Sequence, residues 1–457
     1  MINRRQFNKG LLASTLGGLA IHLHASELLK LNHFMGQNRA YGPLISDPKG
    51  ILDLPEKFSY RIISKRDDVM DDGLPVPDRA DGMGCFTLDN ERIVLVRNHE
   101  LPPNKKTSAV TDKIRILADN AFDVDPNGYP LPGGTSHIIY NLKTGKVEKQ
   151  FMSLLGTIRN CSGGTTPWGS WLSCEESVEN ASTSISKNHG YIFEVPALTQ
   201  GLVAPVPLKE MGRFNHEAAC VDPRTGIVYL TEDRNDSLFY RFIPKQAGKL
   251  AMGGKLQALA ITNQPQFDTR NWDSTAFILN SELPCSWVDL ANVDTDSDDL
   301  RIRGFEQGAA IFARGEGLHF DNGEMYFCCT SGGKQQLGQI MRYRPSKFEG
   351  TTKEQQQPGK LSLFLESADK VSFNFGDNLT VAPNSHLIVC EDQYSLQVNN
   401  HLKGVKPNGD IYDFAKVRWQ TEAAGACFSP DGSTLFVNLY SPTATLAITG
   451  PWEKYKD

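Results

Sequence analysis

Residues 376–393 read GDNLTVAPNSHLIVCEDQ: a polar start, a short strand, a turn containing Pro and Asn, a strongly apolar strand and an acidic end. Five further copies of this pattern occur along the chain. They begin at Gly82, Asn160, Asn215, Gly315 and Ala424. Copies of this size predict a radial or linear array of repeated units, in which equivalent positions of each copy lie in equivalent places.

Between the copies lie segments in which aromatic and aliphatic residues alternate with polar ones, such as GYIFEVP at 190–196 and SLFYRFIP at 237–244. This period of two, bounded by turn residues, is typical of half-buried antiparallel strands. With a variable fourth strand, each copy would form one blade. The sequence therefore predicts an all-β fold, a six-bladed β-propeller with a central metal site. A solenoid of stacked β units is the alternative, and the uneven spacing of the copies disfavours it.

The N-terminal segment has the features of a targeting signal, because NRRQFNK at residues 3–9 precedes a mildly apolar run. We interpret residues 1–25 as a twin-arginine signal segment, which predicts a periplasmic or secreted protein; a basic tail is the alternative. Residues 26–80 are predicted to wrap the outside of the propeller and to supply a strand that closes the ring. Residues 81–457 are predicted to form the six-bladed propeller domain.

The charge balance excludes one class of partner. The formal net charge is −6 and the basic residues form no patch, so we expect no nucleic acid and instead a site for cations. The nine cysteines, an odd number in a protein predicted to be exported, do not suggest a disulfide framework. We interpret most of them as small buried hydrophobic residues, and we expect a monomer.

Carboxylates recur at equivalent places in the copies, either after the apolar strand or near the start. They are Glu100, Glu175, Glu176, Glu232, Asp233, Glu391 and Asp392 after the strands, and Glu217, Glu316 and Asp377 near the starts. In a propeller these positions would meet at one mouth of the central channel, where the carboxylates would repel one another unless cations bind. Hard oxygen ligands favour calcium. Solvated strand ends are the alternative interpretation.

Two further residue types extend this acidic set. Cys161 lies in a polar, Gly-rich stretch, where a thiolate beside carboxylates would suit a softer metal such as iron; Cys174 is the competing candidate. Arg314 precedes Glu316 by two residues, so both share a face if the segment is a strand. A guanidinium beside metal ligands can bind phosphate oxygens in a bidentate manner, whereas the simpler interpretation is a salt bridge.

The combined motifs resemble the PhoX-type alkaline phosphatases. The resemblance rests on the twin-arginine start and on the stretches 97–100 (RNHE), 160–176, 215–217 (NHE), 231–234 (TEDR), 314–317 (RGEG), 376–378 (GDN), 390–392 (CED) and 428–432 (FSPDG). It implies a six-bladed propeller with iron and calcium ions at its centre, and hydrolysis of phosphate monoesters outside the cytoplasm. By resemblance, Cys161 and Glu217 bind the iron pair, Arg314 holds the phosphate and Glu316 binds metal.

The sequence thus predicts an exported phosphatase that acts on small phosphate esters by metal-assisted hydrolysis, with calcium and iron as cofactors and the twin-arginine export machinery as a partner. The predicted catalytic residues are Arg314 and Glu316. The predicted metal ligands are Glu100, Cys161, Glu175, Glu176, Glu217, Glu232, Asp233, Glu316, Asp377, Glu391 and Asp392. No nucleophile-elbow motif occurs in the sequence, which argues against a nucleophilic serine.

Two other classes of protein remain open at this stage. One is a calcium-dependent propeller hydrolase of the lactonase or phosphotriesterase kind, with a single central calcium ion and no iron. The large carboxylate set and Cys161 argue against it. The other is an exported propeller that binds partners without catalysis, which predicts an acidic set that holds no transition metal.

Overall fold

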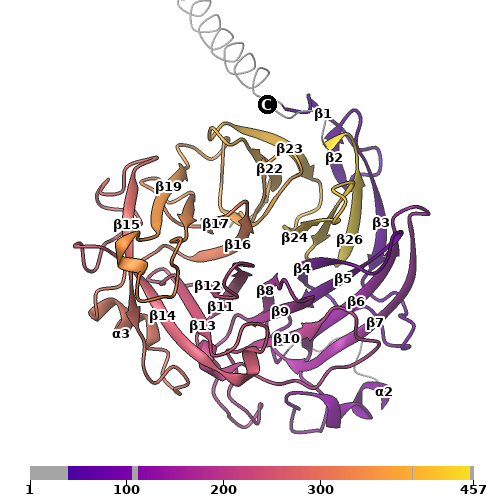
Figure 1. Ribbon diagram of the computed structural model, residues 1–457. Helices are drawn as coiled ribbons and strands as arrows, with labels where there is room; N and C mark the ends of the chain where they lie inside the picture. The colour runs from indigo at the N-terminus through magenta and orange to yellow at the C-terminus, as the bar shows by residue number, and fades with distance from the viewer. Residues whose placement is uncertain (1–39, 105–111, 394, 453–457) are drawn as a thin grey trace, which may run out of the picture.

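The computed structural model describes residues 40–104, 112–393 and 395–452, so the predicted signal segment 1–25 lies outside the described residues. Most elements are strands, in sheets arranged around a central axis (Figure 1). The described helices are α2 (Asp112–Arg115), α3 (Leu300–Glu306) and the 3-10 turns η1 (Ala118–Asn120), η2 (Lys209–Met211), η3 (Leu250–Met252) and η4 (Glu354–Gln356). None of the described helices has the length and apolar character needed to cross a membrane.

Four of the five sheets each contain one copy of the repeat. The first copy forms β4 (Ala80–Thr87), β5 (Arg92–His99), β6 (Gly133–Asn141) and β7 (Lys146–Thr157). The second forms β8 (Asn160–Thr165), β9 (Ser170–Glu175) and β10 (Ile192–Pro196). The fifth forms β20 (Gly376–Val381), β21 (Leu387–Glu391), β22 (His401–Val405) and β23 (Ile411–Val417), extended by β2 (Leu52–Pro55) and β1 (Leu44–Ile45). The sixth forms β24 (Ala423–Phe428), β25 (Thr434–Leu439) and β26 (Ala444–Thr449), completed by β3 (Ser59–Lys65).

The third and fourth copies share one nine-stranded sheet. The third supplies β11 (His216–Val221), β12 (Val228–Glu232), β13 (Tyr240–Pro244) and β14 (Gly254–Ile261). The fourth supplies β16 (Gly315–Asp321), β17 (Glu324–Cys329), β18 (Gln339–Arg344) and β19 (Lys360–Glu366). A further strand from the long insertion, β15 (Glu282–Asp289), pairs with both β14 and β19. The predicted all-β, propeller-like fold is confirmed, but the described residues form five sheets rather than six because β15 joins two copies.

The first strand of each copy faces the central axis. These strands, β4, β8, β11, β16, β20 and β24, contact one another in that order, and β24 contacts β4, so they close a ring (Figure 1). The outer sheet edge is closed by an early segment of the chain, since β3 pairs antiparallel with β26 from near the C-terminus. Nearby, the Phe58 ring lies 4.7 Å from that of Trp452 and 5.0 Å from that of Tyr41. Burial of each such aromatic side chain stabilises this closure by about 1.5–3 kcal/mol.

The core lies between neighbouring sheets, and this explains why the second strand of each copy is so apolar. In β25, with the sequence TLFVNL, all side chains are buried because adjacent sheets cover both faces. The turn before it has its own local cause. Gly432 adopts a left-handed conformation with φ of 71°, and the Asp431 carboxylate accepts a hydrogen bond from the Ser433 N–H at 3.1 Å.

Every inner strand has an irregularity in its pairing with the second strand of its copy. The register shifts after Ala80, Asn160, His216, Gly315, Gly376 and Ala424. The residues that follow directly are Asp81, Cys161, Glu217, Glu316, Asp377 and Gly425. A β-bulge bends its strand and changes the direction of the side chain at the bulge. The fold therefore gives five copies the same means of directing a carboxylate or thiol side chain toward the axis.

Adjacent inner strands approach each other closely through glycines. A Cβ atom added at Gly164 of β8 would lie 1.8 Å from the carbonyl oxygen of Ala219 in β11. One added at Gly317 of β16 would lie 2.7 Å from the Cα atom of Asn378 in β20. Both separations are too short for real atoms, so closure of the ring depends on the missing side chains at these positions.

We expect Gly164→Ala to lower the free energy of unfolding by at least about 1–3 kcal/mol, because the inner strands must move apart to admit the methyl group. Urea denaturation followed by circular dichroism measures this change. Gly201→Ala is the control, since a Cβ there meets nothing within 4 Å, and it should change stability by no more than about 0.5 kcal/mol. Equal unfolding midpoints for the two variants would contradict the close approach of β8 and β11.

Candidate active site

One mouth of the channel contains a strongly acidic cavity of about 300 Å³. Nine carboxylates, three arginines, a cysteine and a tyrosine line it. They are Arg79, Asp81, Glu100, Arg159, Cys161, Glu176, Glu217, Asp233, Arg314, Glu316, Asp377, Asp392, Glu422 and Tyr440. The structure thus brings together the predicted residues Glu100, Cys161, Glu176, Glu217, Asp233, Arg314, Glu316, Asp377 and Asp392.

The cavity is built from two sets of equivalent positions. The first set consists of the bulge residues of the inner strands, Asp81, Cys161, Glu217, Glu316 and Asp377. The second set consists of residues that directly follow the second strand of a copy, Glu100, Glu176, Asp233 and Asp392. Repetition of the blade therefore places carboxylates from several copies around one axis. The sixth copy differs, because Gly425 stands at its bulge and leaves a gap in the first set.

Three predicted ligands, Glu175, Glu232 and Glu391, do not line the cavity. Each is the last residue of its strand, and its successor faces the cavity. Because successive side chains of a strand point to opposite faces, only one member of each acidic pair can reach the channel. The other member is buried among backbone donors and other polar groups. Glu232 accepts from the Tyr240 hydroxyl at 2.7 Å, and Glu391 accepts from the Asn374 N–H at 2.9 Å.

The Glu175 carboxylate is the centre of a buried hydrogen-bond network behind the cavity. Its carboxylate accepts from the N–H groups of Ile158 at 3.0 Å and Gly190 at 2.9 Å, and it contacts Nδ1 of His189 at 2.6 Å. Nε2 of His189 lies 3.3 Å from Asp123. Glu175 thereby fixes the backbone that directly precedes Arg159 of the cavity, so its role in this structure is to position neighbouring residues.

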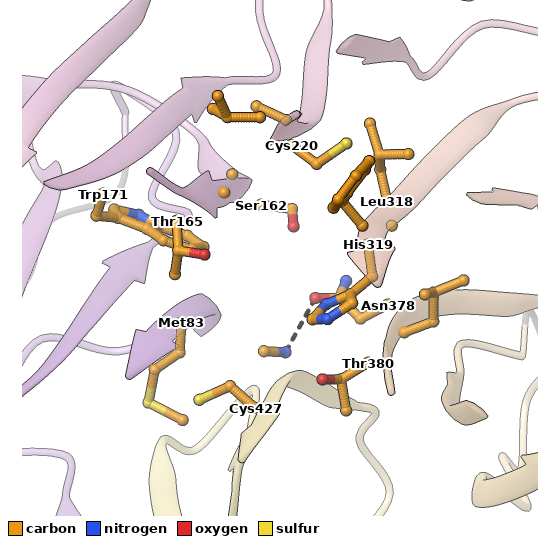
Figure 2. A pocket seen from close by; sticks show the side chains of 18 of the residues that line it. Met83, Ser162, Thr165, Trp171, Cys220, Leu318, His319, Asn378, Thr380 and Cys427 are labelled. Atoms are coloured by element: carbon orange, nitrogen blue, oxygen red, sulfur yellow. Dashed lines mark hydrogen bonds between the residues drawn. The ribbon is translucent and has the colours of Figure 1, made fainter. Parts of the chain in front are cut away.

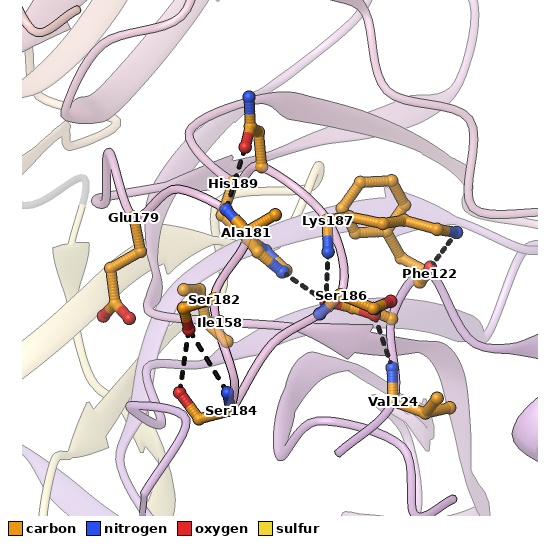
Figure 3. Close-up of polar contacts among 12 residues, drawn as sticks. Phe122, Val124, Ile158, Glu179, Ala181, Ser182, Ser184, Ser186, Lys187 and His189 are labelled. Carbon is orange, nitrogen blue, oxygen red and sulfur yellow. Dashed lines mark hydrogen bonds and ion pairs between the residues drawn. The ribbon is translucent and has the colours of Figure 1, made fainter. Parts of the chain in front are cut away.

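The loop before His189 folds around the same carboxylate of Asp123. The backbone N–H groups of Ser186 and Lys187 donate to it at 2.9 and 3.0 Å, and the Ser186 hydroxyl also donates to it (Figure 3). Burial alone would lower the pKa of His189, but the carboxylates of Glu175 and Asp123 outweigh burial and raise it to about 9. The imidazole is therefore positively charged at neutral pH, paired with two anions.

Burial and mutual repulsion dominate the electrostatics of the cavity. Burial raises the pKa of the carboxyl groups of Asp81, Glu217 and Glu316 well above the usual range, and neighbouring carboxylates raise it further. Burial is also the main cause that raises the pKa of Glu176 to about 8, although Arg159 opposes it. One buried oxygen of Asp81 and one of Glu217 have no hydrogen-bond partner among the described residues. Such carboxylates favour a bound cation.

Among the described residues, three groups of side chains could hold metal ions, with the candidate ligand atoms of each group within 4.8 Å of one another. They are Cys161, Glu176 and Glu217; Glu217, Glu316 and Asp377; and Asp377, Asp392 and Glu422. Consecutive groups share one carboxylate, Glu217 or Asp377, so adjacent ions could be bridged. Of the two candidate thiols, Cys161 lines the cavity and Cys174 is buried in the hydrophobic core.

The three arginines occupy equivalent positions, two residues before a bulge residue. Arg79, Arg159 and Arg314 have φ angles of 53°, 44° and 55°, in the left-handed region that side chains rarely adopt. The guanidinium of Arg314 donates two hydrogen bonds to Asp233, at 2.7 and 2.8 Å, and one to Glu316 at 2.8 Å. The predicted pair Arg314 and Glu316 is therefore in direct contact.

Sequence reasoning missed five residues of the cavity: Arg79, Asp81, Arg159, Glu422 and Tyr440. A spacing pattern in the sequence could have identified three of them. Arg79-Ala80-Asp81 and Arg159-Asn160-Cys161 repeat the spacing of Arg314-Gly315-Glu316, with arginine two residues before the carboxylate or thiol at the bulge. Tyr440 directly follows the second strand of the sixth copy, the position that Glu100, Glu176, Asp233 and Asp392 occupy in theirs, but it is not a carboxylate. Glu422 lies three residues before Gly425, and no equivalent position in the other copies indicates it.

The opposite part of the channel has a different chemistry. It contains a cavity of about 320 Å³ lined by the continuations of the inner strands beyond their bulges. Side chains such as Ser162, Cys220, His319 and Cys427 surround this cavity, and no carboxylate or arginine does (Figure 2). Within the described part of the chain, the channel is therefore one-sided: its carboxylates and arginines line one of the two cavities.

These features define a class, a propeller-like ring of sheets with an acidic, arginine-containing site at one channel mouth. The sequence model of the family described as alkaline phosphatase PhoX matches residues 39–123 and 133–443. The chain belongs to the PhoX family of alkaline phosphatases, and it is an enzyme of the phosphatase class. No curated protein sequence matches it.

A solved structure shares its fold. The structure of Pseudomonas fluorescens PhoX in complex with vanadate, a transition state analogue, matches with a TM-score of 0.67 and 17% sequence identity, covering 90% of this chain and 98% of that one. A gluconolactonase from Xanthomonas campestris matches with a TM-score of 0.43 and 10% identity, covering 90% and 99% of the two chains.

We expect His189→Gln to lower the free energy of unfolding at pH 6 by about 3 kcal/mol, since the folded-state pKa of about 9 exceeds the unfolded value of about 6.5. This contribution is complete below pH 6.5 and is lost as the pH rises through 9. The difference from wild type, measured by chemical denaturation, should therefore shrink between pH 7 and pH 10. His137→Gln is the control, because burial lowers the pKa of His137 to about 4 and its effect should not change over this range.

Proposed function

We propose that this phosphatase hydrolyses phosphate monoesters outside the cytoplasm, with calcium and iron ions held at the acidic mouth of the channel. The observation that carries this proposal is the juxtaposition of Arg314 with the ligand groups. Its guanidinium contacts Asp233 and Glu316, and Glu316 belongs to the middle one of the three groups that share carboxylates. Cation sites and an anion-binding group are thus adjacent.

The donor set fits the proposed ions. Cys161, with Glu176 and Glu217, would hold iron, because a thiolate suits a transition metal. The all-carboxylate group of Asp377, Asp392 and Glu422 would hold calcium, which prefers hard oxygen ligands. When bound, such ions supply charge stabilisation for the phosphoryl oxygens and activation of the attacking water. The partnerless buried oxygens of Asp81 and Glu217 are consistent with this occupancy.

The residues of the chain contribute binding and orientation. Arg314 presents two nitrogens in a planar fork, which matches two oxygens of a phosphoryl group. In this structure the guanidinium donates to Asp233 and Glu316. Bound cations would attract these two carboxylates, and the guanidinium nitrogens could then donate to the substrate. Glu316 follows Arg314 by two residues, at the start of β16. Its contact with the guanidinium would keep Arg314 beside the proposed metal ligands. Together these groups would hold the phosphoryl group and stabilise charge that develops as the ester bond breaks.

The remaining parts of the proposal concern architecture and location. We count the nine-stranded sheet as two blades joined through β15, which gives six blades with the other four sheets. Residues 1–25 would direct export by the twin-arginine machinery, 26–80 would wrap the propeller, and 81–457 would form the phosphatase domain. We propose a monomer. A single-calcium lactonase would use about four ligands and leave the nine carboxylates and Cys161 unexplained.

Elemental analysis of the exported protein, combined with hydrolysis of p-nitrophenyl phosphate at alkaline pH, tests the proposal. We expect both calcium and iron in the purified protein, and hydrolysis that a calcium chelator abolishes and added calcium restores. A protein without iron and without chelator-sensitive hydrolysis would falsify the proposed function. Calcium alone, with lactone hydrolysis, would favour the lactonase class instead.

Arg314→Ala should lower kcat for p-nitrophenyl phosphate by about 100-fold or more, because the charge on the phosphoryl oxygens loses its fork of donors. Its iron and calcium content should stay at the wild-type level, since Arg314 is not a ligand. Arg344→Ala is the matched control: this arginine lies in the same sheet but is paired with Glu282 and Glu324 away from the cavity. Unchanged turnover of Arg314→Ala would remove this residue from the site.

A further inference from the structure

We propose that Arg79 contacts a second anionic group, a carboxylate or phosphate carried by the leaving group of the ester, and so determines which phosphate esters the enzyme prefers. This inference rests on the proposed function, because it assumes that the phosphoryl group is bound near Arg314. Arg79 lines the acidic cavity, directly before the first inner strand.

The three arginines of the cavity differ in their partners. Arg159 is paired with Glu100 at 3.1 Å and with Glu176. Arg314 is paired with Asp233 and Glu316. Arg79, by contrast, forms no ion pair with any residue of the described chain, although nine carboxylates line the same cavity. Its positive charge is therefore available to a ligand.

The local structure holds Arg79 in place without neutralising it. Its guanidinium lies over the ring of Tyr440, 5.6 Å from the centroid, and the Tyr440 hydroxyl donates a hydrogen bond to Glu100. The carbonyl oxygen of Arg79 accepts from the N–H of Glu100 at 2.9 Å. Its φ of 53° is unusual for a side-chain-bearing residue, and such strained positions cluster at functional sites. A cation–π contact restrains the side chain but keeps its hydrogen-bond donors available.

The order of the inner strands places Arg79 across the channel from Arg314. Arg79 directly precedes β4 and Arg314 directly precedes β16. In the closed ring, β8 and β11 separate these strands on one side, and β20 and β24 separate them on the other. An ester whose phosphoryl group is bound at Arg314 would therefore extend its leaving group across the cavity toward Arg79.

The charge of the cavity explains why such a residue matters for selectivity. The carboxylates that favour cations would repel a leaving group that carries its own negative charge. A guanidinium without a carboxylate partner offsets that repulsion and can bind the anion through paired hydrogen bonds. A neutral leaving group needs no such contact. Arg79 would thus admit esters whose leaving group carries an anion of its own, in addition to the charge of the phosphoryl group, to a site that otherwise excludes them.

Matched substrates test this inference on the metal-loaded enzyme. 3-Phosphoglycerate and glycerol 3-phosphate differ by a carboxylate on the leaving group, and fructose 1,6-bisphosphate and fructose 6-phosphate differ by a phosphate. We expect Arg79→Gln to lower kcat/KM for the more charged member of each pair by about 10- to 100-fold, the strength of a charge-assisted hydrogen bond. The other member should lose no more than about threefold, and a loss confined to one pair identifies which anion is bound.

Arg79→Lys keeps the charge and should retain most of the preference, which keeps the test informative if the Gln variant folds poorly. Arg92→Gln is the control, since Arg92 lies at the far end of β5 and is paired with Asp89 on the surface. Equal losses for both members of a pair, or no loss for any substrate, would overturn the assignment of Arg79. A wild-type enzyme that hydrolyses none of the four esters would contradict the proposed function as well.

Discussion

The mutual repulsion of nine carboxylates at one channel mouth is the constraint on which the rest of this structure depends. Two unit charges 4 Å apart interact by about 4 kcal/mol at an effective dielectric constant of 20, and the cavity of about 300 Å³ holds many such pairs. Burial raises the pKa of the carboxyl groups of Asp81, Glu217 and Glu316, and this repulsion raises it further. Three arginines offset only part of it, so bound cations are the natural counter-charge.

The repeated units bring these carboxylates together, because equivalent positions in each unit lie around one axis. One bulge per inner strand directs a side chain to the axis, and the end of the second strand supplies another. The packed strands between sheets are apolar on both faces, so their burial offsets the cost of the acidic mouth. The copies also differ at the bulge itself: Cys161 stands in the second copy where four others have a carboxylate, and Gly425 leaves this position without a side chain in the sixth. Similar backbones that carry different side chains at equivalent positions thus form an asymmetric site.

The repeat pattern in the sequence predicts the ring of strands and part of the acidic site, but not every residue of that site. The copies and their apolar strands predict the all-β ring and the convergence of Glu217, Glu316 and Asp377. They do not distinguish Glu176 from Glu175, because only the pairing of β9 shows which of two adjacent residues faces the channel. Asp81 falls outside the predicted copies because the repeat pattern places the start of the first copy one residue later, at Gly82. The sheet shared by the third and fourth copies could not be foreseen, since β15 lies in an insertion without a repeat pattern.

The acidic mouth also connects metal binding with folding. Unsatisfied buried oxygens such as those of Asp81 and Glu217 destabilise the metal-free folded state, and ions that bind only this state stabilise it by mass action. The network of Glu175 and His189 holds the backbone behind the site before any ion binds, because its hydrogen bonds are complete within the chain. A scaffold that is ordered by its own contacts, with an acidic mouth that favours bound cations, suits an enzyme that would fold and load metal before the proposed export.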